Sequence, residues 1–320
     1  MIAKKSMCIL LSILFILGSF SVSIGQTIDH NSTNNSTLLY QSKTLNEESD
    51  DLTSLIAQIK ESTVTGYISS LVGFGPRVTG SSACENAGNY IASTFSGMGL
   101  DVVIQPWSNG GYQGENIEAI LEGEDTNSDE IYIVCAHYDS VSGSPGADDD
   151  AAGTAAVLAC AQVMSDYSFS HTVKFVAFSG EEQGLLGSEY YADHAANQNQ
   201  NIVEVLNADM IGYALNEEGR SKIKVYGSGT IQSRSQTIGT TYQEYIDLTV
   251  VPQSASANSD HWPFIQNGYD AAMYHEYQFN DYYHSPQDTM DKMDMNYDMR
   301  VTRMILGTLA SFADFIPPSE

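Results

Sequence analysis

Several apolar runs in the sequence are each followed by side chains that can bind a metal ion. The residues concerned are His137 and Asp149, the adjacent pair Glu181 and Glu182, Asp209, and His284. Histidine combined with carboxylates is a usual ligand set for zinc, and a catalytic zinc has three protein ligands and one open position. One such residue after one apolar run would be an ordinary exposed polar group. Their recurrence after four separate runs indicates a metal centre.

Five of these residues are enough for two zinc ions if one carboxylate is shared. With Asp149 shared, His137 and Asp209 complete one set of three ligands. Glu182 and His284 then complete the other set. Two ions that share a carboxylate lie about 3.5–4 Å apart, and a water bound to them loses a proton near neutral pH. The sequence therefore predicts a hydrolytic centre with two zinc ions per chain.

Two further acidic residues are predicted to assist this centre. Glu181 has no metal ion of its own in the arrangement above, so it can act as the general base beside the water. An adjacent glutamate pair is most often simply solvated, but this pair lies between an apolar run and glycines, which favours a site. Asp139 lies two residues after His137 and can accept the second ring N–H of that histidine.

The remaining polar residues near these runs are assigned ordinary roles. Asp148 and Asp150 are predicted to cap a helix or to accept hydrogen bonds. His275 also follows an apolar run, but it lacks the loop pattern around His284 and ranks below it as a ligand. A set of four aspartates lacks the spacing of a calcium loop and is predicted to form helix caps and a solvated face. Its members are Asp288, Asp291, Asp294 and Asp298.

The elements that must position these side chains alternate along the chain. Strands are predicted at residues 101–107, 116–121, 131–136, 173–178, 202–208, 222–226, 248–251 and 270–274. Helices are predicted at 52–59, 64–71, 82–98, 151–164, 185–194, 231–245 and 297–315. Strands separated by helices indicate a largely parallel sheet with helices on both faces, and the first two strands are predicted to form an antiparallel edge. In such sheets, ligands bind outside the carboxyl ends of the strands.

Composition limits the possible partners. The chain has 320 residues, of which 42% are hydrophobic, so it can bury a sizeable core. Its 40 acidic and 13 basic residues give a net charge of −27. Binding to nucleic acid or to an anionic membrane needs a basic surface, so both are excluded. A solvated acidic surface accounts for most of the charge.

The N-terminal region reads as a targeting segment. Lys4 and Lys5 precede an apolar run at 7–20 and small residues at 21–25, which is the pattern of a secretory signal. We therefore expect residues 1–25 to be a signal peptide, 26–50 a polar linker or propeptide, and 51–320 the catalytic domain. The protein is expected to be secreted; the alternative is a membrane anchor formed by an uncleaved signal. The cysteines outside the signal, Cys84, Cys135 and Cys160, form no Cys-x-x-Cys pair and allow at most one disulfide. Cys135 and Cys160 are predicted to be core residues.

Seven motifs occur in one order along the chain. They are GPRVTGS at 75–81, CAHYDS at 135–140, GADDDAAG at 146–153, SGEEQGLLGS at 179–188, LNADMIGY at 206–213, SDHWPF at 259–264 and YYHSPQDT at 282–289. Together they resemble the secreted co-catalytic di-zinc aminopeptidases of leucyl-aminopeptidase type. Their superfamily, the zinc-dependent exopeptidases, also includes glutaminyl cyclases and glutamate carboxypeptidases. The resemblance covers about residues 60–315.

The resemblance implies a fold and residue roles. The implied fold is a three-layer α/β/α sandwich with a mostly parallel, mixed central sheet, of the zinc-exopeptidase, phosphorylase/hydrolase-like type. The implied metal ligands are His137, Asp149, Glu182, Asp209 and His284, with Asp149 bridging. Glu181 is implied as the general base, Tyr283 as a group that stabilises the oxyanion, and the peptide bond after Asp149 as cis. No role is predicted for Asp260 and His261.

The resemblance also implies a function. It is that of a secreted zinc aminopeptidase that removes the N-terminal residue of peptides through a metal-bridging water activated by Glu181. Met210 and the aromatic residues before His284 suggest that the removed residue is apolar. One alternative is a glutaminyl-peptide cyclase with one zinc. Another is a carboxypeptidase or dipeptidase, which would need a basic residue for the substrate carboxylate. The substrates are expected to be peptides with a free N-terminus, and the protein is expected to be a monomer.

Overall fold

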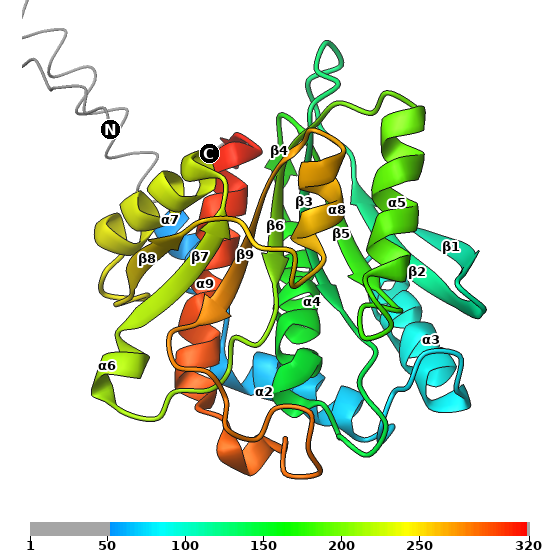
Figure 1. Ribbon diagram of the computed structural model, residues 1–320. Helices are drawn as coiled ribbons and strands as arrows, with labels where there is room; N and C mark the ends of the chain where they lie inside the picture. The colour runs from blue at the N-terminus through cyan, green and yellow to red at the C-terminus, as the bar shows by residue number, and fades with distance from the viewer. Residues whose placement is uncertain (1–51, 319–320) are drawn as a thin grey trace, which may run out of the picture. The chain divides into compact units, whose positions relative to one another are not determined.

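The computed structural model describes residues 52–318, all within a unit of the chain that spans Asn46–Glu320 (Figure 1). The predicted signal peptide (1–25) and linker (26–50) lie outside the described residues. The described part starts with a helical segment at 52–56. Within the described part, no helix combines the length and the apolar character needed to cross a membrane.

A mixed eight-stranded sheet forms the centre of the domain, in the order β1-β2-β5-β3-β6-β9-β7-β8. Its strands are β1 (Asp101–Asn109), β2 (Tyr112–Leu121), β3 (Ile131–His137), β5 (Thr172–Phe178), β6 (Ile202–Ala208), β7 (Lys222–Gly227), β8 (Thr249–Gln253) and β9 (Asp270–Glu276). The strands β5, β3, β6 and β9 run parallel to one another. The pair β1–β2 forms an antiparallel edge as predicted, and β7 is antiparallel to β9.

The central strands are apolar on both faces because both faces are covered. In β3, Val134 and Ala136 join the larger of two hydrophobic clusters, whereas Ile133 and Cys135 join the smaller one. Successive side chains of a strand point to opposite faces, so this continuous apolar run serves two layers. The three cysteines in the described residues are free and buried, which agrees with the prediction for Cys135 and Cys160.

Helices form a layer on each face of the sheet. The smaller cluster is closed by α5 (Leu186–Asn197) and α8 (His261–Gln266), which lie in front of the sheet in Figure 1. The larger cluster is closed by α2 (Glu61–Val72), α3 (Ser82–Gly97), α4 (Gly153–Met164), α7 (Gly229–Thr241) and α9 (Met295–Phe312). The predicted three-layer α/β/α sandwich is therefore confirmed.

Two short strands and two short α-helices in the described residues were not predicted from the sequence. They are β4 (Ser168–Phe169), β10 (Phe315–Ile316), α6 (Glu217–Arg220) and α8. The strands β4 and β10 pair with each other, although nearly 150 residues separate them. Elements of two to six residues carry too few periods of hydrophobicity to be recognised, and only tertiary contacts select them.

Candidate metal centre

The predicted ligands lie at the carboxyl ends of the parallel strands. His137 ends β3, the two glutamates follow β5, Asp209 directly follows β6, and His284 lies in the loop after β9. Two groups have ligand atoms that all lie within 4.8 Å of one another. One is His137, Glu181 and Asp209, and the other is Asp149, Glu182 and His284. The structure thus brings together every residue that the sequence nominated as a metal ligand, together with the nominated base.

The carboxylate of Asp149 faces both histidines. Its Oδ1 lies 3.3 Å from Nε2 of His137, and its Oδ2 lies 3.2 Å from Nε2 of His284. Nε2 of His284 is also 2.9 Å from Oε2 of Glu182, and Nε2 of His137 is 3.8 Å from Oδ1 of Asp209. One carboxylate with an oxygen toward each histidine is the arrangement that a shared ligand requires.

The centre concentrates negative charge away from water. His137, Asp149 and Asp209 are 1%, 4% and 6% exposed. Burial raises the pKa of Glu181 well above its usual value and the pKa of Glu182 to about 8. Burial would also raise the pKa of Asp149, but hydrogen bonds from the two histidines outweigh this effect and lower it. So many buried carboxyl groups are stable together only if protons or cations neutralise them.

The donor set fits two divalent cations. Each of the two groups offers one histidine nitrogen and two carboxylates, which is the chemistry of a catalytic zinc site. Oε1 of Glu182 is buried and has no hydrogen-bond partner among the described residues, so it can bind an ion without losing a bond. Bound dications would also lower the pKa of the surrounding carboxyl groups.

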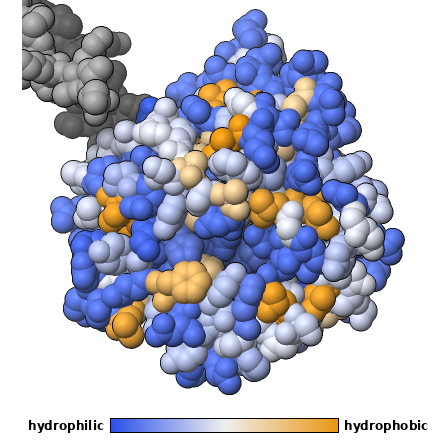
Figure 2. Space-filling model, in the orientation of Figure 1, coloured by the Kyte–Doolittle hydropathy of each residue, from blue (hydrophilic) through white to orange (hydrophobic). Residues whose placement is uncertain are grey.

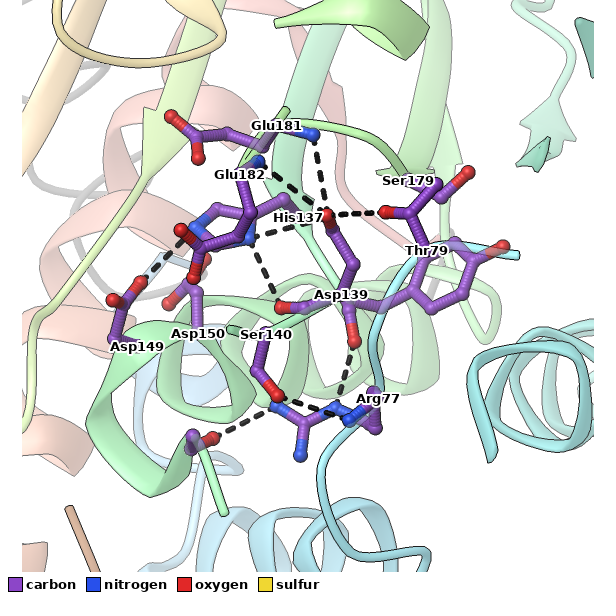
Figure 3. Close-up of polar contacts among 12 residues, drawn as sticks. Arg77, Thr79, His137, Asp139, Ser140, Asp149, Asp150, Ser179, Glu181 and Glu182 are labelled. Carbon is purple, nitrogen blue, oxygen red and sulfur yellow. Dashed lines mark hydrogen bonds and ion pairs between the residues drawn. The ribbon is translucent and has the colours of Figure 1, made fainter. Parts of the chain in front are cut away.

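Asp139 ties the histidine ligand to the glutamate loop (Figure 3). Nδ1 of His137 lies 3.2 Å from the backbone oxygen of Asp139 and 3.5 Å from its carboxylate, so the nearer acceptor is the carbonyl, not the carboxylate as predicted. The carboxylate instead accepts N–H bonds of 3.4 Å from both Glu181 and Glu182. It also accepts a 2.7 Å bond from the hydroxyl of Thr79. Asp139 therefore fixes the backbone of both Glu181 and Glu182.

Arg77 organises the loop that leads to Asp149, and no role was predicted for it. This arginine is fully buried. Its guanidinium donates to the backbone oxygens of Tyr138, Pro145 and Gly146 at 2.7, 2.7 and 2.8 Å. The sequence signal was its place in the motif at 75–81, but the acceptors are backbone atoms, which leave no trace in a sequence.

The acidic residues around Asp149 cap its backbone. Asp288 is fully buried, and its carboxylate accepts the N–H groups of Asp148 and Asp149 at 3.0 and 3.2 Å. Asp298 is also fully buried. The prediction of a solvated face is therefore wrong for these two aspartates, because the loop before α9 carries Asp288 back onto the centre and Asp298 lies on the buried side of α9. Asp150 accepts the N–H of Gly153 at the start of α4, as predicted, and the Asp149–Asp150 peptide bond is cis.

The SDHWPF motif contacts a ligand through its serine. The hydroxyl of Ser259 donates to Oδ2 of Asp209 and accepts a 2.7 Å bond from the side chain of Asn207. Ser259 thereby orients the carboxylate of Asp209. Asp260 and His261 are fully buried beside it. Burial raises the pKa of Asp260 to about 7 and lowers the pKa of His261 to about 4.

The lowered pKa of His261 predicts a loss of stability in acid. The ring is neutral in the folded chain but binds a proton in the unfolded chain below about pH 6.5. Its contribution is therefore present above pH 6.5 and is lost as the pH falls toward 4, by up to about 3 kcal/mol. Urea unfolding of chelator-treated wild type and His261→Gln at pH 7.5 and 4.5 measures this contribution. A smaller acid loss in the variant is expected; equal losses would contradict the prediction.

Aromatic rings form a row that ends at His284. The ring of Tyr283 is stacked on that of His284, with centroids 3.7 Å apart, and Phe279 packs edge-on against Tyr283 at 5.1 Å. His275 stacks on Phe279 at 5.9 Å, and its Nδ1 lies 2.8 Å from the backbone oxygen of Glu276. His275 therefore belongs to neither metal group, which agrees with its lower rank. Burial and then the charges of Asp149 and Glu182 raise the pKa of Tyr283.

The row is open to solvent. Phe279 and Tyr283 are 55% and 40% exposed. In the space-filling view the face seen in Figure 1 is hollowed near its middle, and the surface of the hollow is mainly hydrophilic (Figure 2). A substrate can thus meet both a charged centre and exposed aromatic rings.

Comparison with known proteins places the chain in a family. Residues 116–309, more than half of the chain, match Peptidase family M28. Aminopeptidase YwaD of Bacillus subtilis is 32% identical over 186 residues, which cover 55% of this chain and 40% of that protein. A probable zinc metalloprotease of Pyricularia oryzae is 25% identical over 323 aligned residues, covering 83% and 62%. The chain thus spans about two fifths to three fifths of the length of these two relatives.

Solved structures share the fold. The zinc aminopeptidase BSAP of Bacillus subtilis superposes with a TM-score of 0.73 at 19% identity, over 80% of this chain and 96% of that one. The glutaminyl cyclase of Fimbriiglobus ruber superposes with a TM-score of 0.68 at 18% identity, over 78% and 95%. At these identities the likeness concerns the fold alone. The match over residues 116–309 shows by itself that this chain belongs to the metallopeptidase family M28.

Proposed function

We propose that this protein is a zinc aminopeptidase that hydrolyses the first peptide bond of peptides with a free N-terminus. The observation that carries the proposal is the carboxylate of Asp149, which presents one oxygen to each of two histidines. It supports two ions that share Asp149, with His137 and Asp209 on one and Glu182 and His284 on the other. The zinc aminopeptidase named among the structural neighbours agrees with this choice of metal.

Each residue of the centre has a separate role in the proposed reaction. Zinc ions, when bound, polarise the scissile carbonyl and make the attacking water more acidic. Glu181 lies among the ligand atoms of one group, so its carboxylate can take a proton from the water and pass it to the leaving amine. Asp139 holds the amide of Glu181. Tyr283, stacked on His284, offers its hydroxyl to the developing oxyanion.

The charge of the centre favours substrates with a free amine over substrates held by a carboxylate. A carboxypeptidase or dipeptidase would need a basic group for the substrate carboxylate. Arg77 is the cation whose charge acts on Asp139, Asp149 and Asp150. Its guanidinium is buried and donates to backbone oxygens, so it is not free for a substrate. An ammonium group, in contrast, meets an excess of carboxylates.

The exposed aromatic row supports an apolar first residue in the substrate. Phe279 and Tyr283 present ring surface beside a metal ligand, and aromatic surface binds apolar side chains by removing them from water. A glutaminyl-peptide cyclase is the second candidate, since the same fold occurs in one. One zinc per chain with formation of pyroglutamate would favour the cyclase over the aminopeptidase.

We also propose that the protein is exported. The proposal is supported by the two lysines, the apolar run and the small residues at the start of the sequence. A secreted product that begins near Gln26 would agree with it. Retention on the membrane with the first 25 residues intact would favour the anchored alternative.

Acetylation of the substrate amine tests the proposed function. An aminoacyl anilide such as Leu-p-nitroanilide should be cleaved, with two zinc ions per chain by metal analysis. Its N-acetyl derivative should lose cleavage by at least about 100-fold, because the acetyl group removes the charge that the carboxylates bind. Equal cleavage of the two compounds would rule out an aminopeptidase.

A further inference from the structure

A second pocket lies beside the metal centre and belongs to none of the groups described above. It has a volume of about 500 Å³ and lies between the β1–β2 hairpin and the start of α3. Pro106, Trp107 and Tyr138 supply its apolar walls, and Glu85 and Glu115 supply carboxylates. This volume is within the range of pockets that bind small molecules or single side chains.

The pocket shares a wall with the loop of the proposed base. Nε1 of Trp107 donates a 3.1 Å bond to the hydroxyl of Ser179, which donates a 2.9 Å bond to the backbone oxygen of Glu115. Gly180 has a φ of +83°, and a Cβ there would lie 2.5 Å from the ring of Trp107. Two residues that line the pocket therefore bond to the Ser179 hydroxyl, two positions before Glu181, and the ring of Trp107 also lies against Gly180.

The proposed mechanism indicates which part of the substrate lies near this wall of the pocket. If Glu181 protonates the leaving amine, the leaving part of the peptide starts beside Glu181. The N-terminal residue occupies the side of the aromatic row at His284. The residues that follow the scissile bond should therefore run along residues 179–181. The pocket adjoins this segment, since Trp107 and Glu115 both bond to Ser179.

The charge of the pocket selects a cation. The carboxylates of Glu85 and Glu115 make no hydrogen bond or ion pair within the described part of the chain, and no Lys, Arg or His lines the pocket. Lys and Arg carry a charged head on an apolar stem, and such heads bind carboxylates and aromatic faces. We propose that the pocket receives a Lys or Arg side chain of the leaving part of the peptide substrate, a specificity that rests on the proposed aminopeptidase function.

A kinetic comparison tests the substrate preference. The substrates are Leu-peptides with Arg at the second, third or fourth position and the matching Gln peptides. At one position at least, Arg should lower KM roughly three- to tenfold, as expected for two partly exposed ion pairs. The preference should vanish in Glu85→Gln/Glu115→Gln but persist in Glu61→Gln/Glu244→Gln, which removes the same charge elsewhere. No preference at any position, or a preference that survives in the first variant, would overturn the proposal.

A binding experiment separates this proposal from the peptidase activity. In Trp262→Phe, Trp107 is the remaining tryptophan of the chain, so the tryptophan fluorescence comes from a wall of the pocket. N-acetyl-Ala-Arg-Ala-amide, which is not a substrate of an aminopeptidase, should change this fluorescence more strongly than N-acetyl-Ala-Gln-Ala-amide. Glu85→Gln/Glu115→Gln in the same background should abolish the difference. Equal responses to the two peptides would contradict the proposed binding of a Lys or Arg side chain in the pocket, even if the protein proves to be an aminopeptidase.

Discussion

Replacing Glu181 by glutamine is expected to lower kcat by about 100- to 10,000-fold, the range of general acid–base catalysis, while two metal ions stay bound. Glutamine keeps the size of the side chain and its hydrogen-bonding oxygen, but it cannot take a proton from water. Asp139 would still accept the backbone N–H of residue 181, so the loop should keep its position. Steady-state kinetics and metal analysis of the same preparation provide the two measurements.

The number of bound metal ions distinguishes a role of Glu181 as the base from a role as a metal ligand. Ligand atoms of His137, Glu181 and Asp209 lie close enough together to hold an ion by themselves. If Glu181 were a ligand rather than the base, Glu181→Gln would lose one ion along with its activity. The matched control is Glu182→Gln, which should lose affinity for one ion. Near-normal turnover of Glu181→Gln would remove it as the base.

Replacing Asp149 by asparagine is expected to weaken both metal sites at once. Loss of a residue that only orients a ligand typically costs 10- to 100-fold in metal affinity. Loss of a shared anionic ligand should therefore cost more than about 100-fold at each site. The distances of 3.3 and 3.2 Å from Asp149 to the two histidines are the structural reason. Competition with a chelator of known zinc affinity measures the two constants.

Asp209→Asn provides the control for that experiment. Asp209 lies beside His137 but not in the group of His284, so its loss should weaken one site and spare the other. Full retention of two ions in Asp149→Asn would show that the carboxylate is not shared. Loss of one ion only would restrict Asp149 to a single site.

The main strands and the candidate ligands were predictable because each has a local signal. A continuous apolar run such as 131–136 is typical of a strand in a sheet that is covered on both faces. The observed strand β3 begins at the predicted residue and ends one residue later than predicted. A histidine directly after such a run must lie at the carboxyl end of the strand, as His137 does in β3. Among the short elements that were not predicted, α8 lies at the candidate metal centre. Its six residues include a proline, which obscures the helical pattern in the sequence.

The supporting residues were not predictable, because their partners are backbone atoms brought close by folding. Arg77 donates to carbonyls more than sixty residues away, and Asp288 accepts from amides about 140 residues away. In the sequence Asp288 is one of several aspartates in a polar stretch, and nothing local separates it from those that face solvent. The same holds for Trp107 and Ser179, which meet only because β2 pairs with both β1 and β5, so that Trp107 reaches Ser179 across Gly114.

The sequence alone determined the chemistry of this protein: which side chains can hold metal ions, and that four separate strands deliver them. Residue type and hydrophobic period are local properties, so they can be read without coordinates. Only the tertiary structure decided which oxygen faces which histidine, that Asp139 holds the glutamate loop through its carboxylate, and that a second acidic pocket lies beside that loop. These features depend on distances between residues far apart in the chain, and those distances exist only once the sheet has formed and its core has packed.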